Sequence, residues 1–318
     1  MNTMNDEKVK IEKESLKNKI DFALIFTVKK ANPNGDPLNG NRPRVDYEGF
    51  GEVSDVCLKR KLRNRLQDLG EDIFVQSEDN KKEGDEFTSL RDRYDYNENI
   101  KKIELKINKK NNKKTIDCER HAKVACETWY DVRAFGQVFA FKKDKKSKKD
   151  EEENEKEAPV SIGIRGPVTI HNAVSINPVD IHSQQITKSV NLETESDGKK
   201  GSDTMGMKHR VEYGVYVTYG SINCQLAEKT GFSESDAEKL LTALVTLFEN
   251  DESSARPSGS MKVEEVVWWK HNCKNGQYAS ADVHDSIEIC LDEKGKNPCV
   301  EIKKKLEGLE PVFSKNKK

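Results

Sequence analysis

The chain alternates short apolar segments with longer polar ones. Residues 20–29 are rich in Phe, Ile and Val and have the pattern of a buried strand. Further strands are predicted at residues 103–107, 160–176, 211–223, 263–269 and 286–291. Trp268 and Trp269 are neighbours on one of these strands, so their side chains point to opposite faces. We therefore expect at least one of them in the core.

Three other segments have the periodicity of amphipathic helices. The first begins after Ser54, a suitable N-cap. Its apolar face consists of Leu58, Leu62, Leu66 and Leu69. The second covers residues 119–135. Its apolar side consists of Ala122, Ala125, Trp129 and Val132. The third starts at Ser233, which forms a capping-box-like pair with Asp236. Its apolar stripe is Ala237, Leu240, Leu241, Leu244, Val245 and Phe248. Strands and helices in this arrangement predict an α+β fold.

The amino-acid composition indicates that this core carries charged insertions. Of the 318 residues, 34% are hydrophobic and 35% are charged, a high charge content for a compact domain. Residues 142–158 have almost no apolar side chains and cannot offset the entropy lost on ordering. We expect a disordered charged loop there.

The net charge of −1 conceals a segregation of the two signs. The chain has 55 basic and 56 acidic residues, but residues 54–66 carry five basic side chains and one acid, and residues 150–157 are mostly acidic. A neutral total does not exclude a polyanionic partner, because binding depends on the local field. Lys59, Arg60 and Arg63, opposite the leucine face, are candidate phosphate contacts. The alternative is an ordinary solvated helix face.

Cellular location and metal binding can be judged from the N-terminus and the cysteines. Residues 1–19 lack the apolar segment of a signal peptide, and the apolar run at 22–26 is too short to span a bilayer. The seven cysteines contain no C-x-x-C pair, which is typical of reduced cytoplasmic thiols. We expect a cytoplasmic protein with no membrane partner. Cys118, His121 and Cys126 have metal-like spacing, but without a fourth ligand we favour incidental or buried side chains.

Two polar segments are further candidates for nucleic-acid contact. The Pro, Asn and Gly residues of 31–44 enforce turns and bring backbone amides within reach of a phosphate. The segment 180–210 contains Met205 and Met207, either of which suits an apolar wedge beside a base. A surface loop and a linker are the respective alternatives. Gly163-x-x-Gly166 matches the KH-type loop pattern but has little weight alone.

Four groups of motifs, in this order, resemble one known family. The groups are residues 32–37 (NPNGDP) with 42–46 (RPRVD); 54–64 (SDVCLKRKLRN); 130–136 (YDVRAFG) with 165–168 (RGPV); and 205–209 (MGMKH) with 213–214 (YG), 230–233 (TGFS), 248–251 (FEND) and 254–256 (SAR). They are similar to the guide-RNA-binding backbone subunit of the type I-C CRISPR Cascade, a member of the RAMP superfamily. The context of Cys57 and the FEND segment favour type I-C over type I-B.

The resemblance implies a ferredoxin-like (RNA-recognition-type) palm with an inserted fingers region and a thumb hairpin. The implied boundaries are 20–69, 119–180 and 211–312 for the palm, 70–118 for the fingers, 181–210 for the thumb, 1–19 for an N-terminal extension and 313–318 for a basic tail. Copies would stack head to tail as a filament along CRISPR guide RNA, capped by other Cascade subunits, and the guide would pair with a target DNA strand. No cofactor is implied.

The residues expected to contact RNA combine the basic, turn and wedge positions of these motifs. They are Asn34, Arg42, Arg44, Lys59, Arg60, Arg63, Arg133, Arg165, Lys188, Met205, Lys208, His209 and Arg256. Two positions depart from the family pattern, since Lys188 stands where Arg is usual and Met207 where a basic residue is common.

A catalytic function has little support in the sequence. The chain has no P-loop and no H-E-x-x-H motif. Asp36 and Asp46 are the acids beside the expected RNA path, so the alternative function is a metal-dependent ribonuclease acting on guide precursor or target RNA. In the related type III backbones a loop Asp cleaves target RNA, and alignment on Pro43 puts Asn41 there. An amide cannot act as a general base. We expect a non-catalytic protein, with a lone single-strand RNA binder as a third reading.

Overall fold

The computed structural model describes residues 14–81, 84–103, 106–107, 114–115, 117–140, 161–187, 205–293 and 295–316. Several expectations from the sequence therefore fall wholly or partly outside the described residues. They concern the N-terminal extension, parts of the fingers insertion with the strand at 103–107, the charged loop at 142–158, the end of the predicted hairpin around Lys188, and the end of the basic tail.

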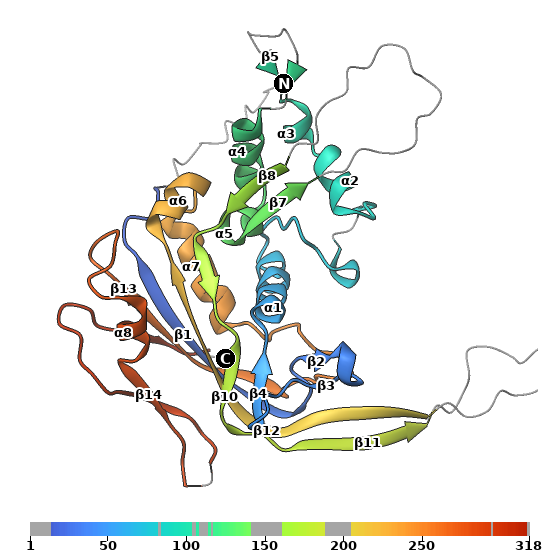
Figure 1. Cartoon of the computed structure of the whole chain (residues 1–318), viewed down its shortest axis with the longest axis vertical. Helices are drawn as coiled ribbons and strands as arrows, with labels where there is room; N and C mark the ends of the chain where they lie inside the picture. The colour runs from blue at the N-terminus through green and yellow to red at the C-terminus, as the bar shows by residue number, and fades with distance from the viewer. Residues whose placement is uncertain are drawn as a thin grey trace, which may run out of the picture.

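An eight-stranded antiparallel sheet forms the centre of the molecule (Figure 1). Its main path is β16-β13-β1-β12-β10-β4, and β9 and β11 also pair with β12. The strands are β1 (Ile20–Ala31), β4 (Phe50–Val53), β9 (Val168–Ile170), β10 (Ala173–Pro178), β11 (Ile181–Thr187), β12 (Met205–Ile222), β13 (Met261–Lys270) and β16 (Val312–Ser314). The combination of helices with one large antiparallel sheet agrees with the predicted α+β class.

The central position of β1 explains its continuous apolar sequence. Phe26 lies opposite Tyr216 of β12 on one side and Val263 of β13 on the other. Successive side chains of a strand point to opposite faces of the sheet. Phe26 accordingly joins one hydrophobic cluster and Ile25 joins another, because both faces of β1 are covered.

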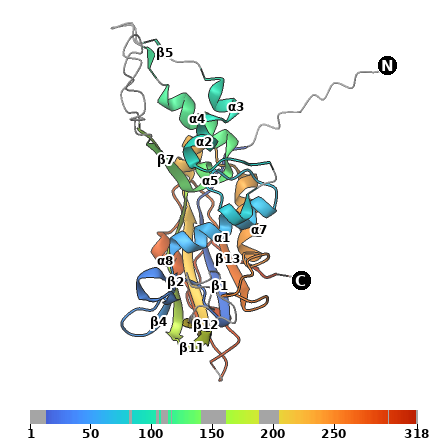
Figure 2. The ribbon, with the colours of Figure 1, turned by 90° about the vertical axis from the view of Figure 1, so that its right-hand side faces the viewer.

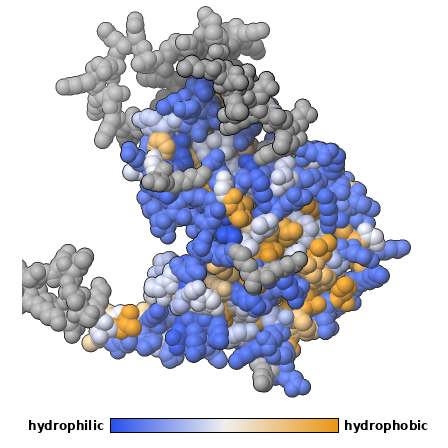
Figure 3. Space-filling view, turned by 180° about the vertical axis from the view of Figure 1, so that it is seen from behind, coloured by the Kyte–Doolittle hydropathy of each residue, from blue (hydrophilic) through white to orange (hydrophobic). Residues whose placement is uncertain are grey.

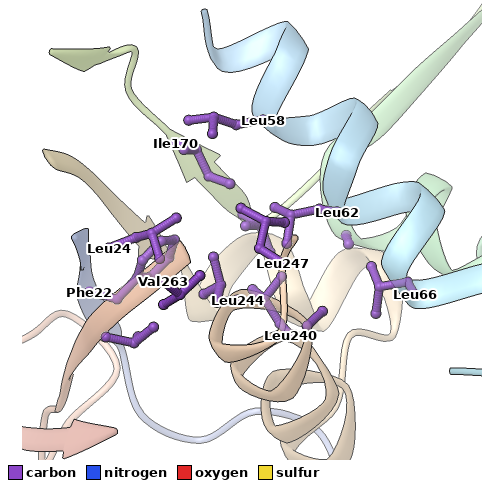
Figure 4. Close-up of a cluster of buried hydrophobic side chains, with 14 of the residues drawn as sticks. Phe22, Leu24, Leu58, Leu62, Leu66, Ile170, Leu240, Leu244, Leu247 and Val263 are labelled. Carbon is purple, nitrogen blue, oxygen red and sulfur yellow. The ribbon is translucent and has the colours of Figure 1, made fainter. Parts of the chain in front are cut away.

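Two helices cover the first face of the sheet (Figure 4). Ser54 caps α1 (Asp55–Asp68) by accepting a hydrogen bond from the Cys57 amide at 3.3 Å, and a capping box opens α7 (Glu234–Val245), as the sequence predicted. The leucines that these helices bury are Leu58, Leu62 and Leu66 of α1 with Leu240 and Leu244 of α7. Each such side chain contributes about 1.5–3 kcal/mol on burial.

The C-terminal part of the chain covers the second face. It contains α8 (Ser280–His284) and a two-stranded ribbon of β14 (Ile287–Cys290) and β15 (Cys299–Ile302). Trp269 belongs to this second cluster, whereas Trp268 belongs to the first. Both tryptophans are therefore core residues on opposite faces, which confirms the expectation for at least one of them.

A third cluster forms a lobe beyond one end of the sheet (Figures 1 and 2). Its elements are η2 (Glu78–Asn80), α2 (Leu90–Asp95), α3 (Glu98–Lys101), β5 (Lys106–Ile107), β6 (Lys114–Thr115), α4 (Cys118–Thr128), α5 (Tyr130–Phe135), β7 (Gly136–Ala140) and β8 (Ser161–Arg165). Phe74 lies against the rings of Trp129 and Phe139, with centroids 4.7 and 5.2 Å away. Residues from 70–118 thus share a core with α4, β7 and β8.

The remaining elements are short. The loop after β1 contains β2 (Gly35–Asp36), η1 (Pro37–Asn39) and β3 (Arg42–Pro43), and α6 (Cys224–Thr230) follows β12.

The prediction of one helix over residues 119–135 was wrong. Trp129 has extended backbone angles (φ −114°, ψ 125°), which end α4 and begin α5. The amide of Tyr130 then donates to the Asp72 carbonyl at 2.8 Å, so the break fixes the two helices against the chain around residue 72. The predicted apolar side still holds, because Ala125, Trp129 and their neighbours face the third cluster.

Other boundaries also differ from the expectations. Leu69 is the C-cap of α1 and is 40% exposed, so it does not extend the apolar face. β12 begins at Met205 instead of residue 211, because its polar first half pairs with β11. Of the predicted strand at 103–107, the described residues are Ile103, which lies outside any strand, and Lys106–Ile107, which form β5. α6, α8, β15 and β16 were not predicted, since each is short and has no clear periodicity.

Candidate nucleic-acid interface

The loop at residues 31–44 is held rigidly against α1 and β1. The Asn34 Oδ1 accepts hydrogen bonds from both the amide and the hydroxyl of Ser54, each at 3.0 Å. The Asn32 side chain donates to the Asn41 carbonyl at 2.7 Å. Asn34, expected to contact RNA, therefore uses its side-chain oxygen to join this loop to the N-cap of α1.

Left-handed backbone explains the choice of residues at the turn of this loop. Gly40 and Asn41 have φ values of 57° and 59°, a region that Gly and Asn tolerate better than other residues. A Cβ on Gly35 would lie 2.0 Å from the Asn41 Oδ1. The turn thus brings Gly35 and Asn41 into close contact and directs the following Arg42 toward the sheet.

Arg42 and His209 meet on a shared hydroxyl. The Arg42 Nη1 donates to Ser183 Oγ at 3.1 Å, and the His209 Nδ1 lies 2.9 Å from the same oxygen. We call Arg42, Ser183 and His209 the hairpin-base cluster. It joins β3 to both arms of the β11–β12 hairpin, which lie side by side with β2 and β3 in Figure 1. Two residues predicted separately as RNA contacts are therefore adjacent.

The arms of the hairpin carry exposed apolar side chains beyond this cluster. Met205 and Met207 are 65% and 54% exposed. Figure 3 shows apolar atoms near the end of the described arms, where they project from the body of the molecule. Because side chains alternate along a strand, Met205, Met207 and His209 share one face, and Lys208 lies on the other. The hairpin-base cluster and the methionines thus form one surface, which we call the hairpin face.

The basic side chains of α1 lie among internal partners. Lys59 pairs with Asp55 at 2.9 Å, and Arg63 pairs with Asp131 at 2.9 Å. Arg60 donates to the Val75 carbonyl at 2.6 Å, and no described carboxylate pairs with it. Burial, together with the nearby Arg63 charge, lowers the pKa of Arg60 to about 10.

These contacts change the expected picture of the basic helix. The side chains of Lys59 and Arg63 are only 25% and 14% exposed, so the run is not the solvated stripe that its sequence suggests. Lys59 neutralises an acid of the same helix, Asp55, and Arg63 neutralises Asp131 of α5. Arg60 keeps a charge without a described carboxylate partner, which makes it the member of the run best suited to an additional anion.

Arg44 at the end of the loop and Arg256 near the loop both have acidic neighbours. Arg44 is 3.4 Å from Asp36, and its side chain is 39% exposed. Arg256 is 3.0 Å from Asp251, which also pairs with the buried Lys61. The Asp251 carboxylate therefore pairs with both Arg256 and Lys61, so these three side chains together contain one more positive than negative group.

Arg133 and Arg165 occupy different environments although their motifs were grouped together. Arg133 is 5% exposed and makes two hydrogen bonds to Asp236, at 3.1 and 2.8 Å. Because this side chain is almost fully buried in an ion pair, we do not include it in the proposed contact set, and its contact with RNA stays a prediction from the sequence. Arg165 is exposed on β8 and lines a cavity of about 780 Å³ with Lys123 and Lys229. Lys188 lies outside the described residues.

The two acids of the alternative ribonuclease function stabilise turns. The Asp36 Oδ1 accepts from the Leu38 amide at 3.3 Å and faces Arg44. The Asp46 Oδ1 accepts from the amides of Glu48 and Phe50, at 2.9 and 2.8 Å. Both carboxylates thus have local structural roles.

The three residues with metal-like spacing do not converge. His121 directs its Nδ1 to the Tyr94 hydroxyl at 2.7 Å. Cys126 is buried, and burial raises the pKa of its thiol to about 12, while Cys118 is exposed.

No helix within the described ranges is long and apolar enough to cross a membrane.

Sequence reasoning missed Ser183, which links the hairpin-base cluster. Ser183 lies in β11, a strand in which every residue after Ile181 is exposed, so no apolar alternation marks it. The signal that was available is positional: Ser183 pairs in register with His209, and that register depends on where the hairpin turns.

Comparisons with known proteins identify relatives of this chain. A model of the family described as CRISPR-associated protein Cas7 matches residues 18–306. A relative from Haloferax volcanii, also described as CRISPR-associated protein Cas7, is 27% identical over an alignment of 304 residues that covers 93% of this chain and 84% of the relative.

Two solved structures are similar at a lower level. One is a chain of a CRISPR RNA-guided surveillance complex, pre-nicking, with 14% identity, a TM-score of 0.44, and coverage of 79% of this chain and 78% of that chain. The other, from a CRISPR RNA-guided surveillance complex, has 15% identity, a TM-score of 0.41, and coverage of 79% and 68%. Both TM-scores are below 0.5, so only the sequence matches bear on the family.

Proposed function

This chain belongs to the Cas7 family of CRISPR-associated proteins, and from that premise we propose that it is a non-catalytic backbone subunit of a type I-C Cascade. Copies associate head to tail along CRISPR guide RNA, with other Cascade subunits capping the filament in the cytoplasm. Such a heterologous contact propagates until the RNA ends. Sequence recognition is left to base pairing between the guide and a target DNA strand.

The hairpin face carries this proposal. It combines a cationic side chain, Arg42, with the exposed thioethers of Met205 and Met207. A phosphate needs a cation or other donors, and a base face needs an apolar surface to stack on. An arm that projects from the sheet and offers both suits a protein that must hold any guide sequence.

The proposed contact set is narrower than the one expected from the sequence. Met205, Lys208 and His209 lie on the hairpin, Arg42 lies on β3 and bonds to Ser183 of the hairpin, and Arg165 lies on the other lobe. Six further residues of the expected set remain in the proposal and would bind RNA while keeping their internal hydrogen bonds or ion pairs. They are Asn34, Arg44, Lys59, Arg60, Arg63 and Arg256. Lys188 remains from the sequence alone.

We also propose the division of the chain into parts. The large sheet with α1 and α7 corresponds to a ferredoxin-like palm, and the β11–β12 hairpin to the thumb at 181–210. The fingers at 70–118 share the third cluster with α4, β7 and β8, so we include the packing partners from those elements in the fingers lobe. The proposed assignment to type I-C rests on the residues around Cys57 and on the FEND segment at 248–251.

A non-catalytic role is supported by the local bonds of Asp36 and Asp46. A cleavage assay with guide precursor and unstructured RNA in the presence of Mg²⁺ tests it. We expect no cleavage by the wild-type protein. Cleavage that disappears in Asp36→Asn or Asp46→Asn would instead establish the ribonuclease function.

RNA binding by the hairpin face is tested with single-stranded RNA and fluorescence anisotropy at low and raised salt. We expect Met205→Ser/Met207→Ser to weaken binding with little change in salt dependence, because stacking is lost and no charge is removed. Unchanged affinity in this variant would exclude the methionines from the contact.

A further inference from the structure

The β14–β15 ribbon carries four metal-ligating side chains on one face. The register pairs Cys290 with Cys299 and Glu288 with Glu301. Side chains two residues apart on a strand share a face, and directly opposite residues are neighbours across the ribbon. The two thiols and the two carboxylates therefore form adjacent rungs of one ladder.

The opposite face of the ribbon is anchored in the protein. Ile287 belongs to the second hydrophobic cluster, and Ile289 and Val300 pack against it. This alternation leaves the cysteine–glutamate face directed outward, where Cys290 is half-buried and Cys299 and Glu301 are exposed. The face is therefore accessible to solvent ions while its backbone is held from behind.

The ligand atoms already converge. The Sγ atoms of Cys290 and Cys299 and a carboxylate oxygen of Glu301 all lie within 4.8 Å of one another. Tetrahedral Zn²⁺ with metal–sulfur bonds of about 2.3 Å and metal–oxygen bonds of about 2.1 Å requires ligand separations of roughly 3.6–3.8 Å. Side-chain rotations that move these atoms by about 1 Å would bring separations of up to 4.8 Å into this range without any change in the strands.

The charges of the ribbon also favour a cation. Glu288 and Glu301 lie directly opposite each other, and like charges in that position destabilise a strand pair. Within the described residues, neither carboxylate has an ion-pair partner. Asp292 in the adjoining turn is not available as a ligand, because its two oxygens accept from the Lys296 amide at 2.6 Å and the Asn297 side chain at 2.7 Å.

We propose that Cys290, Cys299 and Glu301 bind a thiophilic divalent cation, of the class of Zn²⁺, with Glu288 or water as the fourth ligand. Two thiolates and one or two carboxylates form a donor set that suits Zn²⁺ better than the hard cations Mg²⁺ and Ca²⁺. Binding releases the two thiol protons to solvent, and no electrons are transferred.

The structural consequence is a cross-link between two strands that form a sheet of their own. An isolated two-stranded ribbon is marginally stable. The turn of this ribbon approaches β12, where Lys296 lies over the Tyr213 ring at 5.7 Å from its centroid. A bound cation would therefore stiffen the β14–β15 ribbon, whose turn contacts β12, one arm of the hairpin. The proposal does not depend on the function proposed above.

Cobalt titration of the full-length protein tests this site. The protein is reduced with a phosphine, freed of metal with a chelator, and titrated with Co²⁺ while thiolate-to-cobalt charge-transfer absorption is recorded. We expect one Co²⁺ per chain, displaced by Zn²⁺, with loss of the band in Cys290→Ser and Cys299→Ser. Glu301→Gln should weaken binding by at least about tenfold.

The matched control is Cys118→Ser/Cys273→Ser, which removes two exposed cysteines elsewhere and should leave the band unchanged. Circular dichroism confirms that each variant is folded. The proposal is overturned if the fully reduced wild type gives no charge-transfer band. It is also overturned if the band persists in the Cys290→Ser/Cys299→Ser variant.

Discussion

Arg133 of α5 and Asp236 of α7 form a buried two-pronged ion pair. The Arg133 Nε lies 3.1 Å from one carboxylate oxygen of Asp236, and its Nη2 lies 2.8 Å from the other. Asp236 also accepts from the Ser233 amide and hydroxyl as part of the capping box of α7. The pair therefore connects the YDVRAFG motif to the start of the helix that covers the main sheet.

Breaking this pair should destabilise the fold. Removal of one partner leaves the other charged group buried without its oppositely charged partner, at a cost of about 3–5 kcal/mol. We expect Arg133→Ala to lower the free energy of unfolding by that amount, as measured by urea denaturation. The double variant Arg133→Met/Asp236→Leu should lose less than the sum of the single variants. A fully stable Arg133→Ala protein with impaired RNA binding would return Arg133 to the RNA interface.

The hairpin-base cluster gives a second prediction. Arg42→Ala should weaken binding to single-stranded RNA and reduce the slope of log affinity against log salt by about 1, because one phosphate contact is lost. Lys274→Ala is the matched control, since Lys274 is exposed, pairs with Glu228, and lies near the other end of β1. Equal effects of the two variants would show that the Arg42 position has no special role.

Of two glycines in the same motif, only Gly166 should be sensitive to an added methyl group. A Cβ on Gly166 would lie 2.4 Å from the Ala134 carbonyl oxygen, whereas a Cβ on Gly163 has no neighbour within 4 Å. We expect Gly166→Ala to destabilise by about 1–3 kcal/mol and Gly163→Ala to have little effect. Thermal unfolding measures both. Loss of RNA binding in a fully stable Gly163→Ala protein would favour the KH-like reading instead.

His284 should make stability depend on pH below neutrality. Burial lowers the pKa of His284 from 6.5, against the opposing influence of Asp21, and its ring lies near His171 and Lys19 as well. Below pH 6.5 the unfolded chain binds a proton at this position that the folded chain does not bind. Stability is therefore complete above pH 6.5 and falls as pH decreases toward the folded-state pKa, by at most about 1.4 kcal/mol per pH unit.

Urea midpoints between pH 7.5 and pH 5 measure this dependence. We expect His284→Phe to flatten the profile relative to the wild type, because the variant has no group to protonate there. His182→Gln, on the exposed hairpin, should leave the profile unchanged. An identical slope in His284→Phe would assign the dependence to other groups.

The elements that could be predicted from the sequence are those whose signals lie within a few neighbouring residues. Phe22 to Val28 in β1, the Ser54 cap of α1 and the Ser233–Asp236 capping box are all encoded within a few residues, and each is present in the structure. The break at Trp129 could not be predicted in this way, because it depends on packing between Trp129 and Phe74, which are distant in the chain.

The candidate interface was predictable in its residue types but not in its pairing. Arg63 resembles a free phosphate contact in sequence, and only the fold shows that Asp131 lies beside it. Arg42 and His209 are far apart in the chain and meet because β11 and β12 pair in one register. A run of basic residues shows which charges are present, whereas the tertiary structure determines which groups pair with them.

The most direct test of the backbone role is native mass spectrometry of the purified protein with guide RNAs of graded length, at low and raised salt. If copies coat the guide, whole protomers will be added stepwise as the RNA lengthens. The Arg42→Ala protein should give fewer bound copies at raised salt than the Lys274→Ala protein. A fixed number of protomers whatever the RNA length would contradict the filament and leave a single-strand RNA binder.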